Sequence, residues 1–342
     1  MNKKLLTISI PTWNRAEFLK VALEELRSQL DGPLSDFVNV LVSDNCSTDN
    51  TAKIIDQFMS SGLDIQYIRN ESNLGWGRNF QQCISEAETD HVLLLSDDDV
   101  LVDDSISRVI DLIQKHKDVG VICLKPYGFD NDFDIERPNR RNRETIETWV
   151  DAGKFLERIS LEFTLLSCCV INTSRIGKTK YIELSETSNF LHLFYILDSL
   201  FSHTENIYID EYLVASKRNN SVNYEFSEIF VREFWSILDS FRTKGLTPEV
   251  RQRVQDKLLI TYYPFYFQDV RKNFKKDVLI CIENCDKTFG SNKYYKFWAK
   301  PILIWPSFIA QIWGLFVILI GRIKGGEFEK LVWKIRLKLR IR

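Results

Sequence analysis

The chain has 342 residues, enough for one large domain with an appendage or for two domains. Its 44% of hydrophobic and 27% of charged residues are ordinary for a globular protein, and a net charge of −2 excludes the strong basic field typical of nucleic-acid binding. Seven cysteines without a regular framework predict reduced thiols, and a short N-terminal apolar stretch cut by Pro11 does not fit a secretory signal. We therefore expect the catalytic part of the chain to lie in the cytoplasm.

The first part of the chain alternates between short apolar runs and stretches with helical spacing. The predicted strands are Leu5–Ile10, Val38–Val42, Ile65–Ile68, Val92–Leu95 and Val119–Cys123. The predicted helices are Ala16–Leu30, Thr48–Ser60 with Ser47 or Thr48 as its cap, Gly77–Ala87 and Asp103–His116. This alternation predicts an α/β fold with a mostly parallel, Rossmann-like sheet, flanking helices and right-handed crossovers.

The pattern is less regular after Cys123. Gly128–Glu144 is polar and reads equally as a loop ordered near a site or as a surface excursion. The remaining predicted elements are strands at Phe163–Ile171 and Ile207–Ser216, and helices at Phe190–Phe201, Phe226–Arg242 and Pro248–Phe274. We therefore predict a domain of residues 1–220, a helical extension of residues 221–300 and a hydrophobic, basic segment of residues 301–342.

The last segment has the composition of a membrane-associating helix. Pro301–Ile320 carries no charge, which matches the roughly twenty apolar residues that a bilayer requires, although Pro306 and Gln311 weaken the pattern. The tail KLVWKIRLKLRIR alternates apolar and basic residues, which suits anionic headgroups. The alternatives are a membrane span, a re-entrant or in-plane pair of helices, and a helix packed on the protein core with a solvated tail.

One strand ends in three acids. Val92–Leu95 is followed by Asp97, Asp98 and Asp99, whose mutual repulsion a divalent cation or a sugar hydroxyl would offset. The alternative is a solvated turn in which one Asp caps a helix. Polar segments also follow the first three strands, namely PTWNR, SDNCSTD and RNESNLGWGRN, and all would lie along the carboxyl edge of the sheet, where ligands bind in such folds.

These segments together resemble the family 2 glycosyltransferases with the GT-A fold. The matching residues are IPTWNR (10–15), VSDNCSTDNT (42–51), NLGWGRN (73–79) and SDDDV (96–100). The resemblance is close over residues 1–125 and looser to residue 220. It implies a transferase that uses a nucleotide sugar.

The resemblance also implies roles for single residues. Pro11, Thr12, Asn14 and Arg15 would border the nucleotide, Asp44 would accept a hydrogen bond from the base, and Asn73 would brace the loop at the nucleotide. Asp97 would hold the ribose and help to hold the metal, Asp99 would ligate Mg²⁺ or Mn²⁺, and Asp98 would face the donor sugar. The basic residues expected near the base or the diphosphate are Arg69, Arg78, Lys217 and Arg218, the last two being alternatively part of a solvated loop.

The chain departs from the family where the acceptor is activated. Inverting members place a Glu-Asp pair before a helix, whereas this chain has Glu186-Thr187. Glu186 and His192 are both candidates for the general base, and alternatively a helix-terminal acid and a buried helix residue. The missing Asp makes a retaining outcome plausible, as in abequosyltransferase-like members that use a CDP-dideoxyhexose.

We therefore expect a metal-dependent transfer of a hexose or deoxyhexose from a CDP-, UDP-, GDP- or dTDP-sugar. The C-terminal segment suggests a lipid-linked saccharide acceptor at the cytoplasmic face of the inner membrane, as in bacterial O-antigen or surface polysaccharide synthesis. A sugar nucleotidyltransferase and a non-catalytic saccharide-binding or assembly protein are the alternatives. PTWNR lacks the Gly-rich nucleotide loop that the first of these requires.

Overall fold

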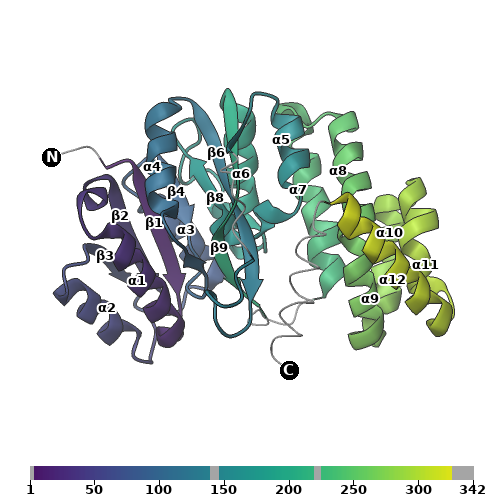
Figure 1. Ribbon diagram of the computed structural model, residues 1–342, viewed down its shortest axis with the longest axis horizontal. Helices are drawn as coiled ribbons and strands as arrows, with labels where there is room; N and C mark the ends of the chain where they lie inside the picture. Colours follow the sequence, from purple (N-terminus) through teal and green to yellow (C-terminus); the bar gives the residue numbers. More distant parts are fainter. Residues whose placement is uncertain (1–3, 139–145, 219–224, 326–342) are drawn as a thin grey trace. The chain divides into compact units, whose positions relative to one another are not determined.

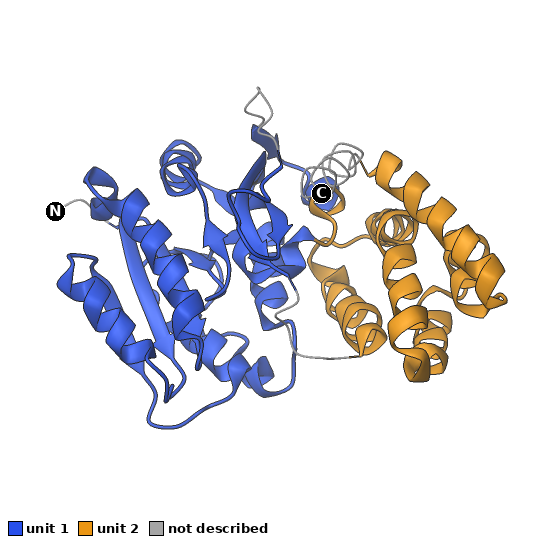
Figure 2. Cartoon of the chain, turned by 60° about the horizontal axis from the view of Figure 1, so that its bottom comes forward, with its two compact units in different colours: residues 1–155, 162–220 blue, residues 156–161, 221–342 orange. Residues whose placement is uncertain are grey.

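The computed structural model describes residues 4–138, 146–218 and 225–325. The chain divides into two compact units, which Figure 2 shows in different colours. One comprises residues 1–155 and 162–220, and the other residues 156–161 and 221–342. The basic tail after residue 325 and residues 139–144 of the predicted polar segment lie outside the described residues. The predicted subdivision at residue 300 stays a prediction.

The first unit is built on one sheet, whose described strands run in the order β3-β2-β1-β4-β8-β6-β9-β5, with β7 paired to β9 (Figure 1). The pairs β1–β2, β1–β4, β2–β3 and β6–β9 are parallel, and the others are antiparallel. The strands are β1 Leu6–Thr12, β2 Val38–Asp44, β3 Ile65–Arg69, β4 His91–Leu94, β5 Val100–Leu101, β6 Val119–Phe129, β7 Ile146–Trp149, β8 Cys169–Asn172 and β9 Glu205–Lys217. The predicted α/β fold is confirmed, with antiparallel pairs added by the later strands.

Helices flank this sheet because each has an apolar face (Figure 1). They are α1 Ala16–Leu30, α2 Thr51–Ser60, α3 Trp76–Ser85, α4 Ser105–Lys115 and α6 Leu191–Ser202, with 3₁₀ turns at Pro33–Phe37, Glu162–Thr164, Leu166–Cys168 and Ile182–Glu186. Helix α5, Ala152–Ile159, has residues in both units. Helix α2 begins three residues later than predicted. The carboxylate of Asp49, and neither predicted cap, accepts the backbone N–H of Thr51 at 3.0 Å.

The parallel register of the first strands fixes what meets at the carboxyl edge of the sheet. Thr12 at the end of β1 lies opposite Asp44 on β2, and Asp44 lies opposite Arg69 on β3. Strand β4 ends beside them, where the N–H of Leu95 still donates to Ser9 of β1 at 2.9 Å. The loop that carries the three acids therefore leaves the sheet next to β1.

The predicted strand at Phe163–Ile171 is largely wrong. Only Cys169 to Asn172 is a strand, and two 3₁₀ turns precede it. Most of the run is apolar and its second half is buried, but Leu165 is 39% exposed, and an apolar run alone does not separate a strand from an irregular segment. Ser167 within it is fully buried and faces the loop after β4.

The second unit is helical with an aromatic core. Trp235 donates a hydrogen bond of 2.8 Å to the hydroxyl of Tyr263, and Phe289 packs against both rings. Its helices are the π-helix Glu228–Glu233, α7 Phe234–Ser240, α8 Pro248–Thr261, α9 Tyr263–Asn273, α10 Val278–Phe289, the π-helix Tyr295–Ala299, α11 Lys300–Ile304 and α12 Ser307–Lys324, with 3₁₀ turns at Arg242–Lys244 and Lys275–Asp277.

The predicted apolar stretch 301–320 is not one helix. Helix α11 ends at Ile304, and α12 begins at Ser307. Pro306 lacks the N–H that would continue the first helix, and its preceding residue Trp305 is extended, with φ −72° and ψ 159°. Among the described residues, α12 is the one helix long and apolar enough to cross a membrane.

Candidate active site

The predicted acidic loop folds against the end of β1. The Thr12 hydroxyl donates a hydrogen bond of 2.8 Å to Asp97, and a guanidinium nitrogen of Arg15 lies 3.2 Å from the other carboxylate oxygen. Asp97 is 3% exposed. Burial raises its pKa to about 7, against the opposing effect of Arg15 and Thr12.

Asp99 is held by two residues that lie later in the chain. It accepts a hydrogen bond of 2.7 Å from the Ser167 hydroxyl and one of 3.0 Å from the backbone N–H of Lys217 at the end of β9. Burial raises the pKa of Asp99 to about 7, and the charge of Asp98 adds to this effect. Two of the three acids are therefore buried carboxyl groups that lack full charge compensation.

Asp98 is the most solvent-accessible of the three. Arg15 donates a hydrogen bond of 2.7 Å to one of its oxygens, and Ser96 donates one of 2.5 Å to the other. Arg15 therefore bridges Asp97 and Asp98. This arrangement anchors the loop and leaves the Asp98 side chain 11% exposed.

The two buried acids fit a hard divalent cation in part. Over the described ranges, no group of three or more His, Cys, Asp and Glu side chains is placed to hold a metal ion. Mg²⁺ is commonly bound by one or two carboxylates together with substrate phosphates, and Asp97 and Asp99 are the two buried carboxylates of this loop that could serve in that way. Their raised pKa values are the sign of carboxylates that a cation would stabilise in the charged form.

Asp44 lies at the end of β2 and is fully buried. The N–H of Ser47 and the hydroxyl of Tyr67 each donate to it at 2.8 Å, on different oxygens. Arg69 lies 3.7 Å away and donates to the Ser47 carbonyl at 2.8 Å. Asp44 thus organises the turn after β2, with Tyr67 and Arg69 beside its carboxylate.

Two predicted loop residues tie neighbouring strand ends together. Asn14 accepts the N–H of Thr48 at 2.7 Å, and its own N–H donates to Ser47 at 2.8 Å. Asn73 accepts from the Asn45 amide at 2.9 Å. Pro11 lies on β1 opposite Ser43, one residue before the edge. These contacts place the predicted nucleotide-bordering residues at one edge of the sheet.

Lys217 is the last residue of β9, Arg218 follows it, and both side chains have partners. Arg218 forms ion pairs with Glu136 at 2.8 Å and with Asp130 at 3.2 Å. The ammonium of Lys217 contacts the Asp130 carbonyl and lies 5.0 Å from the Phe129 ring. Only the backbone of Lys217 reaches the acidic loop in this state.

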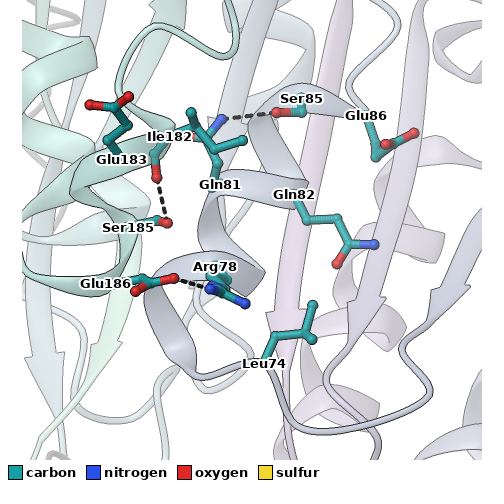
Figure 3. Close-up of a pocket in the computed structure, with 10 residues that line it drawn as sticks. All are labelled: Leu74, Arg78, Gln81, Gln82, Ser85, Glu86, Ile182, Glu183, Ser185 and Glu186. Carbon is teal, nitrogen blue, oxygen red and sulfur yellow. Dashed lines mark hydrogen bonds and ion pairs between the residues drawn. The ribbon is translucent and has the colours of Figure 1, made fainter.

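A cavity of about 590 Å³ is lined by residues of α3 and its flanks and of the turn Ile182–Glu186 (Figure 3). Arg78 and Glu186 form an ion pair across it, and the two side chains are 51% and 57% exposed. The N–H of Leu74 donates to Asn45 at 2.8 Å, so this part of the lining adjoins the loop after β2. The lining residues are Leu74, Arg78, Gln81, Gln82, Ser85, Glu86, Ile182, Glu183, Ser185 and Glu186.

The two predicted candidates for the base differ in environment. Glu186 is exposed at the cavity, whereas His192 is 5% exposed. The Nε2 atom of His192 lies 3.0 Å from the Thr164 carbonyl, and burial lowers its pKa to about 4. The geometry favours Glu186 over His192 for a group that must take a proton from a bound molecule.

Sequence reasoning missed three residues that shape this site. Ser167 supports Asp99, Tyr67 supports Asp44, and Glu136 holds Arg218. Tyr67 carries a weak signal, because it stands two residues before Arg69 on a strand that ends at the site. Ser167 and Glu136 carry none, since one lies in an apolar run and the other in a polar loop.

Comparison with known proteins identifies close relatives of this site region. The model of the family described as glycosyl transferase family 2 matches residues 7–179. The chain is 29% identical over 228 residues to the abequosyltransferase RfbV of Salmonella typhimurium, covering 63% of this chain and 67% of RfbV. It is also 29% identical over 121 residues to the Staphylococcus aureus poly(ribitol-phosphate) β-N-acetylglucosaminyltransferase TarS. This aligned region covers 35% of this chain and 21% of TarS.

Solved structures share the fold. S. aureus TarS 1–349 in complex with UDP-GlcNAc superimposes with a TM-score of 0.63 at 15% identity, covering 95% of this chain and 93% of that one. The mannosyltransferase PcManGT of Pyrobaculum calidifontis, in complex with GDP-Man and Mn²⁺, gives a TM-score of 0.54 at 10% identity, covering 93% and 88%.

Proposed function

The chain belongs to glycosyl transferase family 2, and from this we propose that it moves a hexose or deoxyhexose from a nucleotide sugar to a lipid-linked saccharide in surface polysaccharide synthesis. The observation that carries the proposal is the meeting of Thr12, Asp97 and Asp99 at one edge of the sheet, beside Asp44. Ligands of open α/β sheets bind at such carboxyl ends.

The proposed donor contacts follow from this arrangement. Asp97 accepts hydrogen bonds from the ribose, and Asp44 accepts one from the base once Tyr67 turns aside. Asp99, with Asp97, would hold Mn²⁺ or Mg²⁺. Such an ion neutralises charge on the departing diphosphate. Arg78, Lys217 and Arg218 are the proposed cationic partners of the same phosphates, after exchange of their present partners.

The proposed acceptor chemistry uses Glu186. Its carboxylate takes the proton of the acceptor hydroxyl while the acceptor oxygen bonds to the anomeric carbon. The bond from that carbon to the phosphate oxygen breaks, and the nucleoside diphosphate leaves. Attack from the side opposite the leaving group inverts the anomeric centre. A retained configuration in the product, determined by NMR, would remove Glu186 from this role.

Similarity to RfbV and TarS guides the choice of substrates to test. RfbV is an abequosyltransferase, so we propose a CDP-linked deoxyhexose as the first donor to examine, with UDP-, GDP- and dTDP-sugars beside it. The acceptor would be a lipid-linked saccharide at the cytoplasmic face of the inner membrane. The apolar helix α12 supports this location.

The test begins with binding and ends with transfer. The melting temperature of the chain is measured with CDP, UDP, GDP and dTDP, each with and without Mn²⁺. We expect one base to raise it in a Mn²⁺-dependent way, and the matching nucleotide sugar to be consumed with release of nucleoside diphosphate. Release of a nucleoside triphosphate or pyrophosphate exchange would instead indicate a nucleotidyltransferase.

Variants at two aspartates assign the effect to the site. Asp99→Asn is expected to lower Mn²⁺-dependent turnover by about 100-fold or more. The weakened metal site would no longer stabilise the charge on the leaving diphosphate. Asp90→Asn, at the amino end of β4, is the matched control and should behave like the parent protein. Absence of binding to all four nucleotides, together with no consumption of their sugars, would contradict the proposed transferase.

A further inference from the structure

Helix α12 in the second unit exposes a continuous apolar face. Phe308 is 74% exposed and Leu315 is 64% exposed, although water normally drives such side chains into a core. Only 22% of the helix is buried, unlike a core helix. The exposed members of this face, here called the outer face, are Phe308, Ile309, Ile312, Leu315, Phe316, Leu319 and Ile323.

The opposite face of α12 is fixed to the unit along its length. Ala310, Gly314, Val317 and Gly321 are buried at helical spacing. Gly321 lies so close to α8 that an added Cβ would overlap the carbonyl oxygen of Ile260. These four small or branched residues therefore pack against the neighbouring helices, and the outer face points away from those helices.

The helices beneath α12 are too polar for a bilayer interior. Arg251 on α8 pairs with Asp239 at 2.5 Å, and Lys257 donates to the Glu157 carbonyl at 2.6 Å. Arg271 on α9 donates to the Ile302 carbonyl at 2.6 Å and to the Trp305 carbonyl, which anchors α11 and the break before α12. Charged side chains inside a membrane are rare because their burial there costs free energy. Helix α12 could therefore cross a membrane only by detaching from α8 and α9.

The ends of α12 carry groups that suit a membrane surface. Trp305, Trp313 and Trp298 form an aromatic cluster beside its first turns, and Trp is enriched at membrane–water interfaces. Residues 322–342 contain eight Lys or Arg and only the two acids Glu327 and Glu329. A basic segment that follows an apolar face complements anionic headgroups.

We propose that α12 lies in the plane of an anionic bilayer, with its outer face in the boundary between headgroups and acyl chains. The helix stays packed on α8 and α9 and does not cross the membrane. This orientation decides between the in-plane and spanning alternatives. It rests on the proposed function only in that a lipid-linked acceptor would be met at the same surface.

Vesicle binding tests the orientation without any sugar nucleotide. The full chain is sedimented with vesicles of phosphatidylglycerol and phosphatidylethanolamine, and with vesicles of phosphatidylcholine alone. We expect binding to the anionic vesicles that falls with salt, and much weaker binding to the neutral ones. The double variant Phe308→Ser/Phe316→Ser should bind about tenfold more weakly. Val150→Ser, an 82% exposed apolar residue of the first unit, is the matched control and should bind normally.

Three outcomes overturn the proposal. Equal binding by the double variant and the parent means that the outer face does not enter the lipid. Retention in membranes after alkaline carbonate extraction means that the helix spans. A concentration-dependent dimer that the double variant loses means that a second copy covers the face. Hydrolysis of a soluble nucleotide sugar is measured in parallel, so a failure of the transferase is seen separately from a failure to bind membranes.

Discussion

Thr12 donates a hydrogen bond of 2.8 Å to Asp97, joining the end of β1 to the loop after β4. Thr12→Val keeps the shape of the side chain and removes the donor, leaving a buried carboxylate with fewer partners. We expect a loss of about 1–3 kcal/mol in unfolding free energy. We also expect weaker binding of the nucleoside diphosphate, measured by calorimetry, because Asp97 is no longer oriented.

Thr7→Val on the same strand is the control for this prediction. Thr7 and Thr89 share a buried hydrogen bond of 2.8 Å at the other end of β1. We expect a comparable loss of stability from this variant, with nucleotide affinity unchanged. Equal nucleotide affinity in the two variants would contradict the role given to the Thr12–Asp97 contact.

Metal binding should depend on pH because the two buried acids titrate near neutrality. The pKa values of Asp97 and Asp99 are raised to about 7, so Mn²⁺ must displace protons below that pH. Affinity should rise by up to about tenfold per pH unit between pH 6 and 7 for each displaced proton, and then level off. Titration calorimetry with Mn²⁺ in buffers of different ionisation enthalpy measures both the affinity and the protons released.

The same shifts give the metal-free protein the opposite dependence. Between the usual aspartate pKa near 4 and about 7 the native state holds more protons than the unfolded state, so these two groups make stability fall as pH rises. Asp98→Asn removes a neighbouring charge that raises both pKa values. We expect it to move the Mn²⁺ affinity profile to lower pH, and an unmoved profile would show that repulsion from Asp98 is not a cause.

The sequence predicts the sheet and the acidic loop well for a physical reason. Apolar runs that end in polar residues fix where strands stop, and the parallel register then brings Thr12, Asp44 and Arg69 level with one another. Helix α1 is predicted to the residue because Leu19, Leu23 and other leucines repeat at helical spacing. Local pattern and tertiary structure agree in these elements.

The supporting contacts of the site are not predictable in the same way. Ser167 reaches Asp99 only because its segment turns through two 3₁₀ elements, and an apolar run gives no sign of that path. His192 is buried, and its ring contacts the carbonyl of Thr164, which is remote in sequence. The helix break at Pro306 is signalled by the proline, but the outer face of α12 emerges only once its packing on α8 is known.

Glu186→Gln should separate binding from chemistry. The amide keeps a hydrogen-bond acceptor for Arg78 but takes up no proton, so turnover is expected to fall by about 10²–10⁴-fold. Affinity for the nucleotide and the melting temperature should change little, because both partners of the ion pair are about half exposed. Steady-state kinetics of transfer to an acceptor measure the effect.

Glu183→Gln is the matched control, since Glu183 is exposed on the same turn and lines the same cavity. It should retain nearly full turnover. If Glu186→Gln also retains full turnover while Asp99→Asn does not, the acceptor proton leaves by another route.

The packing of α3 against the turn Ile182–Glu186 should be sensitive to a single methyl group. A Cβ on Gly77 would overlap the backbone carbonyl oxygen of Ser185, one residue before Glu186. Replacing glycine by alanine normally stabilises a helix by about 1 kcal/mol. Here the overlap with backbone makes the change destabilising, because overpacking typically costs about 1–3 kcal/mol.

We expect Gly77→Ala to lower the melting temperature and, by displacing Glu186, to lower kcat more than it weakens nucleotide binding. Gly177→Ala, whose Cβ would meet nothing within 4 Å, should leave both unchanged. Normal kcat in a destabilised Gly77→Ala protein would mean that the position of this turn does not limit the reaction.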